Sequence, residues 1–410
     1  MSVVADLPAK QRGPSFSDRR ARLSEISSRH RSWTILIGML LVGTALPLIV
    51  QFPPFTLAQS PNAWIDGFTN AGVFVLLAMG LNLVVGVAGL LDLGYAAFFA
   101  IGAYTYAYVA SPFGNSILGV DILGALGGPN NAGIIFWPML LVGAGVAALF
   151  GILLGAPTLR LRGDYLAIVT LGFGEIVPLV FLNSDKVTNG TNGIGGLARP
   201  ALPILGGFSG IDPWPYYITA LFLVTIVMMF CYRLIESRIG RAWEAIREDE
   251  LAAAANGINT VVAKLLAFAL GASVAGIAGV FNASKLVTVS PDQFTFVISF
   301  TILAMVVLGG MGNFWGVAVG AFVIYTINNV LLKSLNQFFD TAGIPVLQDV
   351  DFIQLQFLLY GLALVGMMLL RPEGLFPNSR RRRELHTDVT ESEQDELGSV
   401  AGTTEEDLPE

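Results

Sequence analysis

The chain has 410 residues, of which 54% are hydrophobic and only 13% are charged, with a net charge of −7. A soluble protein carries about 25% charged residues, so the composition excludes an ordinary soluble globular domain. The single cysteine, Cys231, excludes an internal disulfide. Both histidines, His30 and His386, lie near the chain ends, which leaves none for a metal or catalytic site in the apolar part.

Apolar segments of about 20 residues recur along the chain, as in proteins that cross a membrane several times. They predict an all-α, polytopic membrane helix bundle with about ten transmembrane helices. The predicted spans are residues 34–52, 63–86, 91–110, 134–156, 165–183, 215–232, 261–283, 294–311, 316–333 and 352–371.

Polar tails flank the predicted transmembrane domain of residues 34–371. Residues 1–33 are rich in Arg and Ser and lack the apolar core of a signal peptide, so they are predicted to be a disordered cytoplasmic tail. Residues 372–410 form a second cytoplasmic tail, which is acidic and predicted to be disordered from residue 384.

Basic residues orient the predicted spans, because Lys and Arg concentrate in cytoplasmic loops. With the N-terminus inside, only four of the 23 Lys and Arg residues fall outside: Lys186, Arg199, Lys285 and Lys333. Both termini are therefore predicted to be cytoplasmic. The connections 86–94 and 309–316 are too short and apolar for ordinary loops, which indicates tight hairpins or broken helices at membrane depth.

A charged segment, SRIGRAWEAIREDELAAAANGIN, spans residues 237–259 within the predicted cytoplasmic loop 233–260. Helix-forming residues from Trp243 to Ala255 precede Gly257, which stands where a C-terminal cap is expected. The acidic residues argue against a helix lying on an anionic lipid surface. The pattern favours a helix that docks on a cytoplasmic partner.

This loop resembles the coupling loop of ABC importer permeases, whose pattern is Glu-Ala-Ala, three residues, then Gly. Ala252, Ala253 and Gly257 keep that spacing, whereas Leu251 replaces the Glu and Glu250 stands one position early. Further motifs are GLLDLGYAAFFAIGAY (89–104), LRGDYLAIVTLGFGEI (161–176), TNGTNGIGG (188–196), SRIGRAWEAIREDE (237–250), VLGGMGNFWGVAVGA (307–321) and RPEGLF (371–376). Together, over residues 60–376, they resemble the LivM-type permease of high-affinity branched-chain amino acid importers.

The resemblance implies a permease subunit of an ATP-driven importer in the bacterial plasma membrane. A second homologous permease chain completes the translocation path, an extracytoplasmic binding protein delivers substrate, and two cytoplasmic ATPase subunits supply energy. The chain lacks the G-x-x-x-x-G-K-[ST] phosphate loop, so ATP is expected in the partner subunits. We expect no enzyme activity, cofactor or metal in this chain. The residues expected to couple it to the ATPase are Arg241, Trp243, Ile246, Glu250, Leu251, Ala252, Ala253 and Gly257.

Two acidic residues are candidates for the translocation path. Glu175 lies near the middle of span 165–183, where a carboxylate is costly. A lining role and a structural hydrogen bond both remain open for it. Asp92, in the connection 86–94, either faces the path or caps a helix. The segment 184–214 is either a landing site for the binding protein or a flexible loop.

Alternative functions remain. An importer of urea or short-chain amides belongs to the same family, but Asp92-Leu93-Gly94-Tyr95 is more similar to the amino-acid branch, since the urea branch tends to have Ser-Leu-Gly-His. An ion-coupled secondary transporter usually needs several intramembrane ionisable groups. A membrane-embedded enzyme is disfavoured by the lack of H-E-x-x-H and G-x-S-x-G motifs.

Overall fold

The computed structural model describes most of the chain between residues 60 and 331. The described residues are 38, 42–51, 60–119, 122–125, 132–158, 163–202, 206–208, 210, 212–331, 358, 361–362, 365–366, 369–370 and 375–376. Both predicted tails lie outside this set, apart from residues 375 and 376, as do most of the predicted span 352–371 and residues 34–37, 39–41 and 52 of the predicted span 34–52.

The chain divides into two compact units, Met1–Ile49 and Val50–Glu410. In the first unit, residues 42–49 are helical. In the second unit, the long helices are α4 (Pro61–Leu81), α5 (Tyr95–Ala110), α8 (Phe136–Thr158), α9 (Asp164–Asn183), α11 (Trp214–Ile235), α14 (Thr260–Leu286), α15 (Phe296–Gly309) and α16 (Phe314–Thr326). The short helices are α6 (Pro112–Leu118), α7 (Ile122–Ala125), α10 (Asp185–Thr188), α12 (Arg238–Glu248) and α13 (Glu250–Ala255).

The remaining elements are single turns and two-residue strands. Helical turns of other types are η1 (Asn82–Val87), η2 (Ala132–Ile135), η3 (Gly190–Asn192), η4 (Pro291–Phe294) and η5 (Ile327–Leu331). The strands are β1 (Ile194–Gly195), β2 (Ala201–Leu202), β3 (Gly206–Gly207) and β4 (Thr288–Val289), which pair antiparallel as β1 with β4 and β2 with β3.

Among the described residues, six helical segments are long and apolar enough to cross a membrane. They are Pro61–Val87, Gly133–Thr158, Tyr165–Asn183, Trp214–Ile235, Thr260–Leu286 and Pro291–Gly309. These segments confirm the helical class and show long apolar helices at six of the predicted spans. The predicted spans 91–110 and 316–333 correspond to the shorter helices α5 and α16. The structure therefore does not establish the predicted total of ten.

The core of the second unit forms around α14, which packs against α8, α5 and α4. Helix α5, and helix α4 after Asn70, are apolar on all sides, the pattern of helices enclosed by other helices, and nearly every residue of α5 is buried. In the segment Pro61–Val87, which contains α4, 83% of the most apolar stretch is buried. In Tyr165–Asn183, which lies in α9, the buried share is only 22%. Helix α9 thus lies at the periphery of the chain.

Glycines allow the central helices to approach backbone to backbone, as small residues do at helix contacts in membrane proteins. A Cβ on Gly276 of α14 would lie 2.5 Å from the carbonyl oxygen of Gly143 on α8. A Cβ on Gly102 of α5 would lie 2.8 Å from the carbonyl carbon of Gly276. Gly145, in the same small-residue run as Gly143, has no atom within 4 Å of such a Cβ. Only some of the small residues are therefore required at helix contacts.

The two short apolar connections are compact, as predicted. Helix α4 ends in the π-helical turn η1, and residues 88–94 then run without helix to the start of α5. We call residues 88–94 the helix break. Between α15 and α16 the chain turns at Gly310 and Gly312, both with positive φ, which glycine adopts at little cost.

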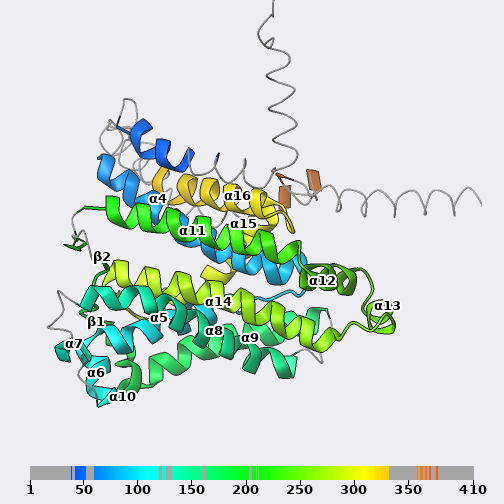
Figure 1. Cartoon of the computed structure of the whole chain (residues 1–410), viewed down its shortest axis with the longest axis horizontal. Coiled ribbons are helices and arrows are strands. Elements are labelled where there is room, and N and C mark those ends of the chain that lie inside the picture. The colour runs from blue at the N-terminus through cyan, green and yellow to red at the C-terminus, as the bar shows by residue number, and fades with distance from the viewer. Residues whose placement is uncertain are drawn as a thin grey trace, which may run out of the picture. The chain divides into compact units, whose positions relative to one another are not determined.

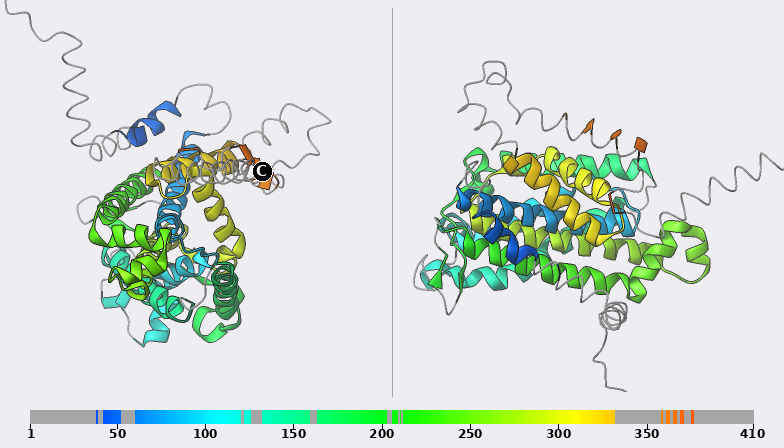
Figure 2. Two further views of the ribbon diagram at one scale, coloured as in Figure 1. Left: turned by 90° about the vertical axis from the view of Figure 1, so that its right-hand side faces the viewer. Right: turned by 90° about the horizontal axis from the view of Figure 1, so that it is seen from above.

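The two ends of the helices in the second unit carry different elements (Figure 1). Helices α12 and α13 lie at one end, and β1, β2, α6 and α10 lie at the opposite end. The right-hand view of Figure 2 shows the same separation. The charged loop and the segment 184–199 are therefore on opposite sides of the helical region.

Candidate functional site

The charged loop forms two helices, α12 and α13, instead of the predicted continuous helix from Trp243 to Ala255. The chain is extended at Asp249, with φ −151° and ψ 112°. The Asp249 carboxylate accepts hydrogen bonds from the amides of Leu251 and Ala252, at 2.8 and 3.0 Å, and so caps α13. The prediction of one rigid helix was wrong because this aspartate begins a new helix.

Helix α12 is anchored on the protein's own helices by Trp243. The side chain of Trp243 is fully buried, and its Nε1–H donates to the carbonyl oxygen of Ala263 at the start of α14, at 2.6 Å. Ile246, one turn later, is also buried. Trp243 and Ile246 therefore pack inside the chain. Arg241 is exposed, and its guanidinium bonds to the carbonyl oxygen of Glu236 at 2.9 Å.

Helix α13 is joined to α14 by an ion pair. Nζ of Lys264 lies 2.6 Å from Oε1 of Glu250, and only 9% of the Lys264 side chain is exposed. Ala253 is buried, and the amide of Ile258 donates to its carbonyl oxygen at 3.1 Å. Gly257 then has φ +84°, which confirms the predicted left-handed cap.

The outer side of α13 is apolar and exposed. Leu251 is 70% exposed, and Ala252, Ala254 and Ala255 are exposed beside it. We call these four residues the α13 face. Of the residues predicted to couple to an ATPase, Arg241, Leu251, Ala252 and Gly257 are exposed, Glu250 is partly exposed, and Trp243, Ile246 and Ala253 are buried.

Arg247 connects the loop to the helix break, a contact that the sequence analysis did not predict. Its Nη1 donates to the carbonyl oxygen of Gly86, in η1, at 2.7 Å. A Cβ on Gly89 would lie 3.0 Å from Cγ of Arg247, so the arginine stem covers this glycine. The sequence around Arg247 does not show whether its side chain contacts another segment of the chain or is exposed to solvent, because charged residues are common throughout this loop.

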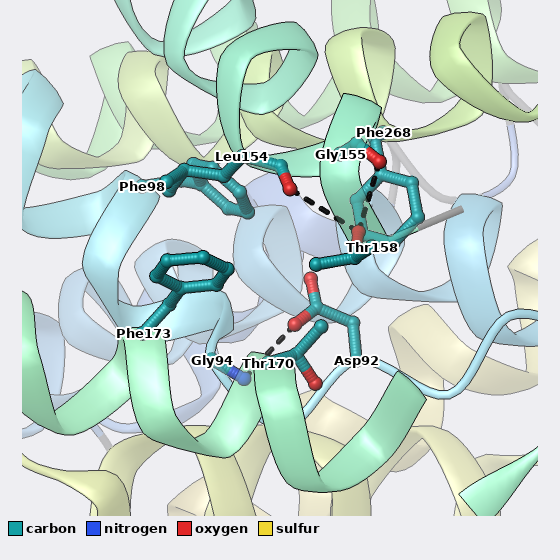
Figure 3. A pocket seen from close by; sticks show the side chains of 9 residues that line it. All are labelled: Asp92, Gly94, Phe98, Leu154, Gly155, Thr158, Thr170, Phe173 and Phe268. Atoms are coloured by element: carbon teal, nitrogen blue, oxygen red, sulfur yellow. Dashed lines mark hydrogen bonds between the residues drawn. The ribbon is translucent and has the colours of Figure 1, made fainter. Parts of the chain in front are cut away.

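Asp92, in the helix break, faces a pocket between α5, α8, α9 and α14 (Figure 3). The side chain is only 2% exposed. One oxygen accepts from the amide of Gly94 at 2.9 Å, while Oδ2 has no partner among the described residues and points toward Thr158. The pocket is lined by Asp92, Gly94, Phe98, Leu154, Gly155, Thr158, Thr170, Phe173 and Phe268.

The hydrogen bond to Gly94 partly matches the capping interpretation of Asp92. Gly94 is the residue at the start of α5, so the carboxylate bonds locally at a helix terminus. Burying a carboxylate is expensive unless it is well hydrogen-bonded, and the second oxygen makes no such bond to the described residues. Whether Asp92 also meets substrate stays a prediction.

Glu175 lies on the exposed side of α9. This side also includes Tyr165, Ile168, Ile176 and Leu179, each more than half exposed in this chain. No hydrogen-bond or ion-pair partner of Glu175 occurs in the part of the chain that the structure describes, so the alternative of a structural bond finds no support there. The neighbouring Gly174 is buried, and a Cβ on it would lie 2.9 Å from Cα of Gly94.

The segment 184–202 is held in place by several contacts, which disfavours the flexible-loop interpretation. Strand β1 pairs with β4, and the amide of Ala198 donates to the carbonyl oxygen of Ala110 at 2.9 Å. The hydroxyls of Tyr106 and Tyr108 donate to the carbonyl oxygens of Ala198 and Val187. The segment thus forms an ordered surface at the end opposite α12 and α13 (Figure 1).

Residues 64–370 match the model of the family described as the permease component of branched-chain amino acid transport systems. The chain belongs to this family. It is 36% identical over 379 residues to LivM, the high-affinity branched-chain amino acid transport system permease protein of Salmonella typhimurium, covering 88% of this chain and 78% of the relative. It is 35% identical to LivM of Escherichia coli K12 over 94% of this chain and 85% of the relative.

A more distant relative of this permease is LivH of Salmonella typhimurium, 23% identical over 63% of this chain and 82% of the relative. No solved structure matches the chain significantly. Family membership and the six long apolar helices together make this permease a multi-pass membrane protein.

Proposed function

We propose that this chain is the permease subunit of an ATP-driven importer of branched-chain amino acids in the bacterial inner membrane. The family match over residues 64–370, with at least 35% identity to two LivM permeases, is the observation that carries the proposal. The chain moves substrate and is not an enzyme, and ATP binds to partner subunits.

The proposed complex contains a second homologous permease chain. The match to LivH supports this, because LivH is another permease protein of a high-affinity branched-chain amino acid system. One of the two cytoplasmic ATPases docks on the α13 face, where four apolar residues are exposed beyond the end of the helices, and the other docks on the second permease chain. The binding protein lands on the segment 184–202, at the opposite end.

The proposed topology has ten spans and two cytoplasmic termini. The position of α12 and α13 opposite to β1 supports it, because the basic loop 233–260 and the segment 184–199 should then lie on different sides of the membrane. Reporters fused after Arg371 and within 237–259 should indicate the cytoplasm, and one within 184–199 the outside. A cytoplasmic signal from the last would contradict this topology.

The exposed side of α9 is proposed to face the translocation path and the second permease chain. Helices α8 and α11 also expose one side, but apart from Arg233 in the last turn of α11 their exposed large side chains are apolar, as with Leu149, Leu153 and Phe222. Lipid can cover those residues, whereas a mid-span carboxylate in lipid is costly. Glu175 therefore favours a protein or aqueous neighbour for α9. A carboxylate amid aliphatic side chains also suits a ligand with an ammonium group and a branched apolar chain.

The function is tested by reconstituting the permease with its proposed partner subunits in proteoliposomes and measuring uptake of labelled leucine. We expect uptake to require ATP and the binding protein, and to be competed by isoleucine and valine. Competition by urea or short-chain amides instead, or uptake driven by an ion gradient alone, would contradict the proposal.

Glu175→Gln tests the path residue in the same assay. We expect the complex to assemble normally and leucine uptake to fall at least tenfold, because the substitution keeps the shape and removes the charge. Glu236→Gln, at an exposed position where α11 ends, is the matched control and should transport normally. Wild-type uptake by Glu175→Gln would remove this residue from the path.

A further inference from the structure

Arg247 is the residue through which the cytoplasmic loop contacts both η1, at Gly86, and the start of the helix break, at Gly89. Its hydrogen bond to the carbonyl oxygen of Gly86 joins residues 161 positions apart in the sequence. The arginine stem also lies against Gly89, whose φ is +71°. The other contacts described for the loop, those of Trp243 and Glu250, are with α14. Arg247 therefore connects the loop to a different part of the helical region, η1 and the helix break.

The helix break is itself held between other helices. The amide of Leu93 donates to Oγ1 of Thr170, on α9, at 3.0 Å. Gly94 packs against Gly174, the residue before Glu175. Just after the break, in the first turn of α5, the amide of Ala96 donates to Oγ of Ser299, on α15, at 2.9 Å. A displacement of the helix break would therefore move the part of α9 that lies directly beside Glu175.

The other end of the break is also constrained. In η1 the side chain of Asn82 accepts a hydrogen bond from the amide of Gly312, at 2.8 Å. A Cβ on Gly86 would lie 2.6 Å from that same amide nitrogen. Because the π-helical turn is held on this side by the turn between α15 and α16, a pull on Gly86 is transmitted along the chain toward residues 88–94. Single π-helical turns often occur at functional sites.

We infer that Arg247 is a positioning residue, which links movement of the cytoplasmic loop to the helix break and through it to Asp92 and α9. This inference rests on the proposed function, since it assigns the route by which ATPase docking would reach the translocation path. Arg247 contacts neither substrate nor nucleotide in this scheme. Two discrete positions of the break would then correspond to two states of the path, and the loop would select between them.

The test uses the complete importer in nanodiscs, with leucine uptake measured in matched proteoliposomes. Arg247→Met keeps the aliphatic stem and removes the guanidinium. We expect stimulated ATP hydrolysis to continue and uptake to fall at least tenfold. Arg247→Lys retains one donor and should restore part of the uptake. Gly89→Ala should resemble Arg247→Met, because its methyl group would meet the arginine stem.

Hydrogen exchange provides a readout that a merely structural role would not change. The amides of Ala88, Leu90, Leu93 and Gly94 are hydrogen-bonded in the structure. In the wild type, their protection should differ between the nucleotide-free state and a state trapped with ATP and vanadate. In Arg247→Met this difference should disappear, while the exchange of α13 still responds to nucleotide.

Arg238→Met is the matched control, because Arg238 is an exposed arginine on the same helix. It should preserve both uptake and the exchange response. Wild-type uptake with an unchanged response in Arg247→Met would overturn the inference. If Arg247→Met failed to assemble, Arg247→Lys and Gly89→Ala would decide: normal coupling in both would also overturn it. Absence of ATP-driven uptake in the wild type would instead contradict the proposed function.

Discussion

Replacing Trp243 should release α12 from the helices it packs on. The side chain is fully buried, and replacing a buried tryptophan by alanine costs about 3–5 kcal/mol. Trp243→Phe keeps a large ring and loses the hydrogen bond to Ala263, whose net contribution is about 0.5–1.5 kcal/mol. The two variants thus separate the ring contact from the hydrogen bond.

Hydrogen exchange of the α12 amides measures this effect, because local opening exchanges them without global unfolding. Since about 1.4 kcal/mol corresponds to a factor of ten, Trp243→Ala should accelerate exchange roughly 100-fold or more and Trp243→Phe by roughly tenfold or less. Trp214→Ala, at the opposite end of α11, should leave α12 unchanged. Wild-type exchange in Trp243→Ala, or equal exchange in both Trp243 variants, would refute the reasoning.

Three further experiments test the loop and the core. A double-mutant cycle with Lys264→Met and Glu250→Gln, measured by hydrogen exchange of the α13 amides, should give a coupling energy of about 1–2 kcal/mol. This value is intermediate between exposed and buried ion pairs because Glu250 remains 30% exposed. Additive effects of the two substitutions would show that the ion pair does not stabilise α13. Ala253→Pro removes the first bond of α13, to the carbonyl oxygen of Asp249, and costs ~3 kcal/mol; uptake should be lost while the spans still insert, and normal uptake would argue against docking through α13. Gly276→Ala should lower the melting temperature of the permease because its Cβ would lie 2.5 Å from a carbonyl oxygen, whereas Gly145→Ala has open space and should not; equal melting temperatures would contradict the packing argument.

The sequence was sufficient to predict most of the long helices. Apolar length determines where a helix can cross a membrane, so spans such as 134–156 and 261–283 agree with α8 and α14 to within a few residues. The glycines at 143, 271 and 276 lie at helix contacts, where small residues let helices in a membrane approach closely. The weaker predictions concern segments where the apolar run is short, as in α5 and α16.

The loop shows why the remainder could not be predicted. An amphipathic pattern gives an apolar side to a helix but not the surface that covers it, so Trp243 looked like a partner contact and is instead an internal anchor. Asp249 lies within a run of helix-forming residues, yet its side chain competes for backbone amides and starts a second helix. The bond from Arg247 to Gly86 depends on how distant segments meet, which a single sequence does not indicate.

The division of the loop into two helices separates two mechanical requirements. A docking element must expose an apolar surface, and the α13 face does so, with Leu251 70% exposed. A transmitting element must be attached firmly to the helices that move, and α12 is attached through Trp243 and Arg247. In a single straight helix, the directions of the docking side chains and of the anchoring side chains would both be fixed by the same repeat of 3.6 residues per turn. The extended residue Asp249 removes that restriction, so α13 can present its surface outward while α12 keeps its anchors inside. The interruption at Asp249 between α12 and α13 is therefore compatible with force transmission, provided that the ion pair between Glu250 and Lys264 keeps α13 fixed to the start of α14.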